Sequence, residues 1–278
     1  MEAVEKDRPR PEPVSRPRKS FGVVLRDLLG PALIFVLFFG LWEVIVRALD
    51  MPAVILPAPS EVAGIFAEKG SYLLAHLVPT FTSILLGFAL GVGGGFGAGV
   101  LIDQSAWVRE VSYPYLVASQ VIPKIALAPL FVVWFGYGII PKVVMAALIC
   151  FFPVVINTIR GFASVEPELV QFMGSLGASR WEIFRKLAVP WAMPYVFAAM
   201  KISMALAVIG TVVGEFVGSN RGLGYVIFYH ETTLDTPLMF GALLLLSALG
   251  VALFISVVLA ERYFVSWQLS VETPPETL

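Results

Sequence analysis

Six long apolar segments alternate with short polar ones along the chain, and each is close to the length that crosses a bilayer as a helix. A transmembrane α-helix needs about 20 predominantly apolar residues. Few charges interrupt the apolar segments. There are more such segments than the core of a soluble domain requires. The pattern therefore predicts an all-α polytopic membrane protein with six transmembrane helices, at residues 28–49, 79–102, 113–135, 139–159, 192–217 and 237–259.

A longer polar segment, from Arg160 to Pro190, separates the fourth and fifth apolar segments. Its first half has apolar residues at helical spacing, which places them on one face. Gly177 is expected to end this helix, and Ser179 to Glu182 has the capping-box form that begins another. The second helix is expected to stop before Pro190. The apolar face of the first helix comprises Val165, Leu169, Phe172, Met173 and Leu176.

Composition supports the membrane class and excludes several others. Apolar residues make up 58% of the chain, charged residues 14%, and the mean hydropathy is +0.85. An average soluble domain has about 25% charged residues. A net charge of -1 without a basic face gives no reason to expect nucleic-acid binding. The single Cys150 excludes an intramolecular disulfide, and His76 and His230 are expected in solvated loops, so no metal site is predicted.

The ends of the chain and its basic residues predict the orientation. Residues 1–27 are rich in Pro and charge and are expected to form a disordered tail, followed by a domain at 28–262 and a short tail at 263–278. The first apolar segment carries Glu43 and Arg47, which favours a retained helix over a cleaved signal peptide. Lys and Arg are concentrated in the tails and in 160–190, so these segments are expected in the cytoplasm. The outer segments hold little beyond Lys69, Lys142 and Arg221.

The second apolar segment carries four glycines at strict four-residue spacing. On a helix they form a smooth ridge against which another helix can pack closely. A phosphate-binding loop is the alternative, but the Lys-Ser or Lys-Thr that should follow is absent. Upstream, Ser60 is expected to cap a short interfacial helix. The helix-packing glycines are Gly87, Gly91, Gly95 and Gly99.

Polar residues inside the apolar segments are candidates for a translocation pathway, because ionisable groups in hydrocarbon usually face a bundle interior or water. The third segment contains Pro114, Pro123 and Pro129 and is expected to bend beside such a pathway. Structural alternatives remain open, since a lysine near a membrane face can snorkel and amides can bond between helices. The candidates are Gln120, Lys124, Asn157, Lys201 and Glu215.

Segment 160–190 resembles the EAA loop of permease subunits of ATP-binding-cassette importers. That pattern is Glu-Ala-Ala, three residues, Gly, nine residues and then Ile-x-Leu-Pro, and here Gly177 and Pro190 match it. Gln171-Phe172-Met173 stands where the family has Glu-Ala-Ala, which suggests a more apolar contact with the ATPase. The residues assigned to ATPase coupling are Val165, Leu169, Gln171, Phe172, Met173, Leu176, Gly177, Ala178 and Ser179.

Other stretches are similar to the nitrate, sulfonate and taurine branch of these permeases. They are residues 56–60 (Leu-Pro-Ala-Pro-Ser), 122–130, 134–136, 152–157 and 222–225 (Gly-Leu-Gly-Tyr). The resemblance implies a MetI-like fold, with its core at about 79–262, in a bacterial inner membrane. It also implies a second permease copy, two cytoplasmic ATPase subunits and a periplasmic or lipid-anchored binding protein as partners.

The resemblance also implies a transport subunit without catalytic residues or cofactors of its own, with ATP and Mg on the partner ATPase. No Gly-x-x-x-x-Gly-Lys-Ser/Thr sequence occurs in the chain, in agreement with that division. Nitrate, sulfonate, taurine or bicarbonate is the expected solute, and a thiamine-pyrimidine or riboflavin-type precursor is the alternative. An ion-driven secondary carrier is the competing class, and it would need no docking loop.

Overall fold

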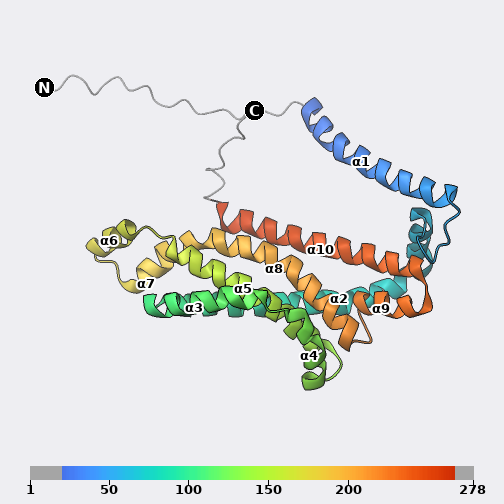
Figure 1. Ribbon diagram of the computed structural model, residues 1–278. Helices are drawn as coiled ribbons and strands as arrows, with labels where there is room; N and C mark the ends of the chain where they lie inside the picture. Colours follow the sequence, from blue (N-terminus) through green and yellow to red (C-terminus); the bar gives the residue numbers. More distant parts are fainter. Residues whose placement is uncertain (1–20, 267–278) are drawn as a thin grey trace. The chain divides into compact units, whose positions relative to one another are not determined.

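The computed structural model describes residues 21–266, and every regular element among them is helical (Figure 1). The chain divides into two units, Met1–Met51 and Pro52–Leu278. In the first, α1 (Phe21–Ala48) begins before Leu28, where the apolar segment was expected to start. Within α1, Arg47 pairs with Glu43 one turn earlier. The tails expected at 1–27 and 263–278 lie largely outside the described residues.

The second unit contains four helices long and apolar enough to cross a membrane, or five if the bent pair at 106–135 is counted as one span. This agrees with an all-helical membrane protein, while the count of six spans stays a prediction. The elements of the unit are α2 (Pro59–Asp103), α3 (Ala106–Ala118), η1 (Ser119–Val121), η2 (Lys124–Leu127), α4 (Ala128–Phe135), α5 (Ile139–Ala163), α6 (Pro167–Ser175), α7 (Arg180–Ile183), η3 (Phe184–Ala188), α8 (Val189–Gly218), α9 (Leu223–Thr233) and α10 (Thr236–Phe264).

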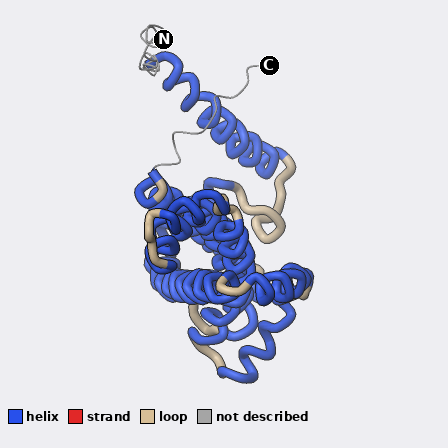
Figure 2. Tube along the Cα trace, turned by 90° about the vertical axis from the view of Figure 1, so that its left-hand side faces the viewer, coloured by secondary structure: helices blue, strands red, loops and turns tan. Residues whose placement is uncertain are grey.

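The long helices α2, α5, α8 and α10 run side by side, with α6 and α7 at one end of this bundle and α9 at the other (Figure 1). The view turned by 90° looks nearly along these helices (Figure 2). α5 packs between α2 and α8. Its central position explains why half of its most apolar window is buried, a larger share than in the other candidate spans.

Glycines line both sides of α5. On the α2 side, a Cβ built at Gly91 would lie 2.6 Å from Cβ of Cys150 and 2.7 Å from the carbonyl oxygen of Ala147. On the α8 side, a Cβ at Gly210 would lie 2.8 Å from Cα of Ala146. No side chain fits at these positions, so the backbones approach each other directly. The contacts on the α2 side are Gly87 with Ala146, Gly91 with Cys150, Gly95 with Val154 and Gly99 with Thr158.

The region before the second span differs from the expectation. Instead of a separate interfacial helix capped by Ser60, α2 runs for 45 residues, with a non-helical backbone at Lys69 that marks a kink. Its N-cap is Ala58, whose backbone N–H donates to Oε2 of Glu61 at 2.9 Å. Pro59 fits the first turn because the N–H that it lacks would have no helical partner there.

The expected stop before Pro190 is wrong. The helix that begins at Arg180 passes through a π-helical turn, Phe184–Ala188, and continues directly into α8. Pro190 falls in the first turn of α8, where a missing N–H is tolerated. Such single π turns occur inside longer α-helices, frequently at functional sites.

Candidate functional site

The coupling segment has the helix, glycine turn and helix expected from its sequence. α6 begins at Pro167, so Val165 precedes the helix rather than belonging to its face. Gly177 has a φ of +82°, a left-handed conformation that glycine adopts without steric cost. Ser179 Oγ accepts from the N–H of Glu182 at 3.2 Å, and Oε2 of Glu182 accepts from the N–H of Ser179 at 3.0 Å. The capping box thus forms as its spacing predicts.

The apolar face of this segment is open to the surroundings. Phe172 is 61% exposed, Leu176 71% and Trp181 66%. Leu169, Met173 and Ala178 are half-buried, whereas Gln171 and Ser179 are exposed. Large apolar side chains gathered in an open patch indicate an interaction surface. α6 and α7 project from the end of the bundle, where a partner can reach them (Figure 1).

A series of aromatic rings connects the coupling segment to the bundle. Trp181 in α7 stacks on Phe184 in η3 at 5.6 Å between centroids, and Phe184 stacks on Phe162 in α5 at 5.7 Å. Phe162 in turn lies 6.4 Å from Phe96 in α2. This connection could not be predicted from the sequence, because ring contacts between distant segments leave no periodic signal. The rings thus form a continuous series of contacts from α7 to α5 and α2.

A cavity lies where the third span breaks. α3 and α4, with their 3₁₀ turns, meet at a bend of 78°, as the prolines of this segment predicted. The cavity has a volume of about 470 Å³ and is lined by residues 120–125 together with side chains of α5 and α8. Gln120 and Lys124 both line it. The structure therefore brings two of the five predicted pathway residues together.

The other three pathway candidates lie apart from this cavity and have partners of their own. Asn157 donates from Nδ2 to the carbonyl oxygen of Pro153 in the same helix at 2.8 Å. Nζ of Lys201 lies 2.9 Å from Oε2 of Glu261, an ion pair between α8 and α10. Glu215 is fully buried.

The Lys201 ion pair gives a testable expectation for a structural role. The reversed pair, Lys201→Glu with Glu261→Lys, is expected to restore the membrane abundance and uptake that Lys201→Glu alone lowers. Both side chains are partly exposed, so the pair contributes about 1 kcal/mol or less. Uptake normalised to abundance is the measurement. A double variant that is abundant but inactive would instead place Lys201 on the solute pathway.

Glu215 is the centre of a buried network at the α9 end of the bundle. Thr80 Oγ1 in α2 donates to its Oε1 at 2.9 Å, and the N–H of Gly224 donates to its Oε2 at 2.8 Å. Nζ of Lys142 in α5 lies 3.6 Å from Oε1. Four elements, α2, α5, α8 and α9, are therefore joined through one carboxylate.

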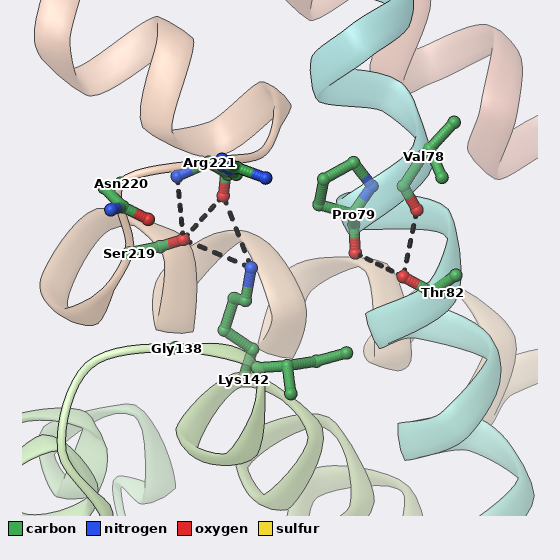
Figure 3. Close-up of a pocket in the computed structure, with 9 residues that line it drawn as sticks. Val78, Pro79, Thr82, Gly138, Lys142, Ser219, Asn220 and Arg221 are labelled. Carbon is green, nitrogen blue, oxygen red and sulfur yellow. Dashed lines mark hydrogen bonds between the residues drawn. The ribbon is translucent and has the colours of Figure 1, made fainter.

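Lys142 also holds the loop that leads into α9, as the close-up shows (Figure 3). Its Nζ donates to Oγ of Ser219 at 3.2 Å and to the carbonyl oxygen of Arg221 at 3.3 Å. The residues in this view line a second cavity, of about 320 Å³. Lys142 lies in the first turn of α5. It was expected in an outer segment, yet only 3% of its surface is exposed.

The carboxylate of Glu215 explains why glycines are needed in the Gly-Leu-Gly-Tyr stretch. Gly222 has a φ of +124°, and a Cβ added there would overlap the carboxylate of Glu215. A Cβ at Gly224 would lie 2.9 Å from Oε2 of the same residue. The N–H of Gly222 also donates to Nδ1 of His76 at 3.0 Å. Only glycine lets the backbone approach Glu215 this closely.

The two histidines lie at this end of the bundle, each with partners. His76 stacks on Tyr225 at 5.8 Å between centroids, and His230 lies 3.9 Å from Oδ2 of Asp235. Asp235 also pairs with Lys69 at 2.8 Å. Within residues 21–266 no group of three or more His, Cys, Asp or Glu side chains is arranged to hold a metal ion.

The sequence was compared with known protein families. The family described as binding-protein-dependent transport system inner membrane component matches residues 84–267, which contain α5, the coupling segment and Glu215. The chain belongs to this family. The permease is therefore a transport subunit of an ATP-driven importer and not an enzyme.

Relatives of the permease serve several solutes. It is 38% identical over 244 residues to the riboflavin transport system permease protein of Chloroflexus aurantiacus, covering 87% of this chain and 91% of that one. It is 36% identical to the formylaminopyrimidine transport permease protein of Halalkalibacterium halodurans, over 86% and 96% of the two chains. A putative aliphatic sulfonates transport permease of Bacillus subtilis is 31% identical, over 92% and 91%. The family expected from the sequence is confirmed.

A solved structure shares the fold. A chain from the inward-facing MetNI methionine ABC transporter superimposes with a TM-score of 0.61 at 20% identity, covering 69% of the permease and 96% of that chain. At this identity the likeness concerns the fold alone. The MetI-like fold that the family resemblance implied is thus confirmed.

Proposed function

We propose that this permease works as one of a pair, with a second copy of the chain, and that the pair forms the translocation pathway of an importer in a bacterial inner membrane. Six spans with both termini in the cytoplasm place the coupling segment on the ATPase side. Two ATPase subunits carry ATP and Mg, and an outer binding protein delivers the solute. The observation that carries the proposal is the open apolar face of α6, held between α5 and α8.

The coupling step needs a contact that differs between two states of the ATPase pair. The face of α6 supplies the contact, and the Trp181, Phe184 and Phe162 rings transmit its displacement to α5. Gln171-Phe172-Met173 gives this contact an apolar character, with Phe172 as its exposed anchor. An ion-driven carrier would have no use for such a face, which favours the importer.

The proposed coupling predicts the effect of Gly177→Val. Because no atom lies within 4 Å of a Cβ built there, the change introduces no clash, and its effect comes from the left-handed backbone alone. For a residue with a Cβ, the left-handed conformation costs roughly 1–2 kcal/mol. This energy lowers the population of the docked conformation by a factor of about 5–30. We expect transport and binding-protein-stimulated ATPase activity to fall together by that factor in reconstituted vesicles.

Gly174→Val is the matched control for this experiment. Gly174 lies in α6, has nothing within 4 Å of its Cβ position and has no positive φ. Its variant should keep most of the activity. Wild-type transport and ATPase rates in the Gly177→Val protein would overturn the docking role. Co-purification of the permease with an ATPase subunit separately tests the assembly.

The solute is proposed to be small and either anionic or heterocyclic, delivered by the binding protein. Sulfonates and taurine represent the first class among the relatives, and riboflavin and formylaminopyrimidine the second. Uptake assays with these compounds in vesicles that contain the complete transporter separate the two classes.

A further inference from the structure

We propose that the cavity at the break between α3 and α4 is a solute-binding site, and that it takes a planar heterocycle presenting a carbonyl or anionic edge to Lys124. This inference rests on the proposed importer function and names the solute class of its pathway. It is carried by the charge, the walls and the exposed backbone of the cavity.

The charge in the cavity has no acidic counterpart. Nζ of Lys124 donates to the carbonyl oxygen of Ser119 at 2.7 Å, and across residues 21–266 no carboxylate lies within ion-pairing distance of it. Lys142 and Lys201, the other lysines of the long helices behind it, each have a glutamate partner. An ammonium group kept at a helix break without a counter-ion is available to an acceptor on a solute.

The walls of the cavity favour a flat apolar body. Nζ of Lys124 lies over the face of the Phe152 ring, 4.7 Å from its centroid, so the cation occupies that face in the absence of a solute. The cavity is also lined by aliphatic side chains of α5 and α8, Ile149, Leu206 and Ile209. A heterocycle that stacks on Phe152 would displace the ammonium from the ring face and meet it with its polar edge instead. A nitrate or bicarbonate ion would leave these apolar walls of a 470 Å³ cavity unused.

The backbone adds an acceptor to this set. Pro153 lines the cavity and has no N–H, so the carbonyl of Ile149 one turn earlier lacks its usual helical donor. Ile149 lines the same cavity, as does the amide side chain of Gln120. Donors at Lys124 and Gln120 beside acceptors at Gln120 and Ile149 match a heterocycle with both kinds of group on its edge. The sulfonate of taurine could pair with Lys124, but taurine has no ring to stack on Phe152 or to contact the aliphatic walls, so it fits less well.

The test uses the complete transporter, with its ATPase and binding protein, in sealed vesicles supplied with labelled riboflavin, formylaminopyrimidine or taurine. Wild-type protein is expected to take up one of the two heterocycles and not taurine. Phe152→Leu and Lys124→Gln should each lower that uptake about tenfold, the effect of losing one stacking or charge-assisted contact. Phe151→Leu is the matched control, since Phe151 is the neighbouring ring of α5 but does not line the cavity.

The outcomes separate this inference from the importer function. Uptake that falls equally in Phe152→Leu and Phe151→Leu, or that is unchanged in Lys124→Gln, overturns the cavity as the solute site. Uptake of taurine, or of neither heterocycle, overturns the solute class. In each of these cases, continued co-purification with the ATPase leaves the importer function standing, whereas its loss in the wild-type protein refutes that function instead.

Discussion

Glu215→Ala is expected to lower the free energy of unfolding by about 3–5 kcal/mol, the usual result of removing one partner of a buried ion pair. The change leaves the ammonium of Lys142 buried without its carboxylate, and it removes the acceptor for Thr80 and for the N–H of Gly224. We expect little of the variant to reach the membrane fraction. The measurement is abundance together with the midpoint of thermal unfolding in detergent.

Two further variants make this expectation specific. Glu261→Ala removes a carboxylate from a partly exposed pair and should cost about 1 kcal/mol or less. The double variant Glu215→Met with Lys142→Met removes both buried charges and should recover part of the loss, because apolar residues of similar volume can replace a buried pair. Equal abundance of Glu215→Ala and Glu261→Ala would show that the network does not stabilise the fold.

Gly91→Val is expected to be the second severe change. Its Cβ would lie 2.6 Å from Cβ of Cys150 and 2.7 Å from the carbonyl oxygen of Ala147, so α2 and α5 must separate. Overpacking of this kind costs about 1–3 kcal/mol or more, and the separation also loosens the contacts of the neighbouring glycines. We expect reduced abundance and a lower unfolding midpoint.

Gly93→Val provides the control, because Gly93 is exposed in the same helix and a Cβ there meets nothing within 4 Å. This variant carries the same change in helix propensity without the clash. If both variants unfold at the same temperature, the close approach of α2 and α5 contributes nothing to stability. A lower midpoint for Gly91→Val alone supports the packing role of the ridge.

Much of the fold was predictable because membrane helices and caps leave local signals. Apolar length marked the spans, the prolines marked the break near Lys124, and the spacing of Gly177 and Ser179 marked the coupling turn. The bend at the break and the capping box are present as expected. In each case the determining atoms lie within a few residues of one another.

The features that could not be predicted from the sequence depend on contacts between residues far apart in the chain. In the sequence Lys142 looks like a residue at the end of a helix. Its burial depends on Glu215, which lies in another helix and pairs with it. α9 was missed because residues 225–229, Tyr-Val-Ile-Phe-Tyr, show no helical period. At the start of α9, the backbone N–H of Gly222 donates to the His76 side chain and the N–H of Leu223 donates to the Thr80 hydroxyl. The cavity likewise needs the break at 120–125 to meet α5 and α8, which are distant in sequence.

The glycine contacts on both faces of α5 have a mechanical consequence. Where backbones touch with no side chains between them, there is no layer that can change rotamer and let one helix slide past the next. We therefore expect α2, α5 and α8 to move as one rigid body. In the proposed coupling the movement reaches the bundle through the rings at α7, and we expect bending where regular helix is interrupted, at the π turn 184–188 and at the bend beside Lys124.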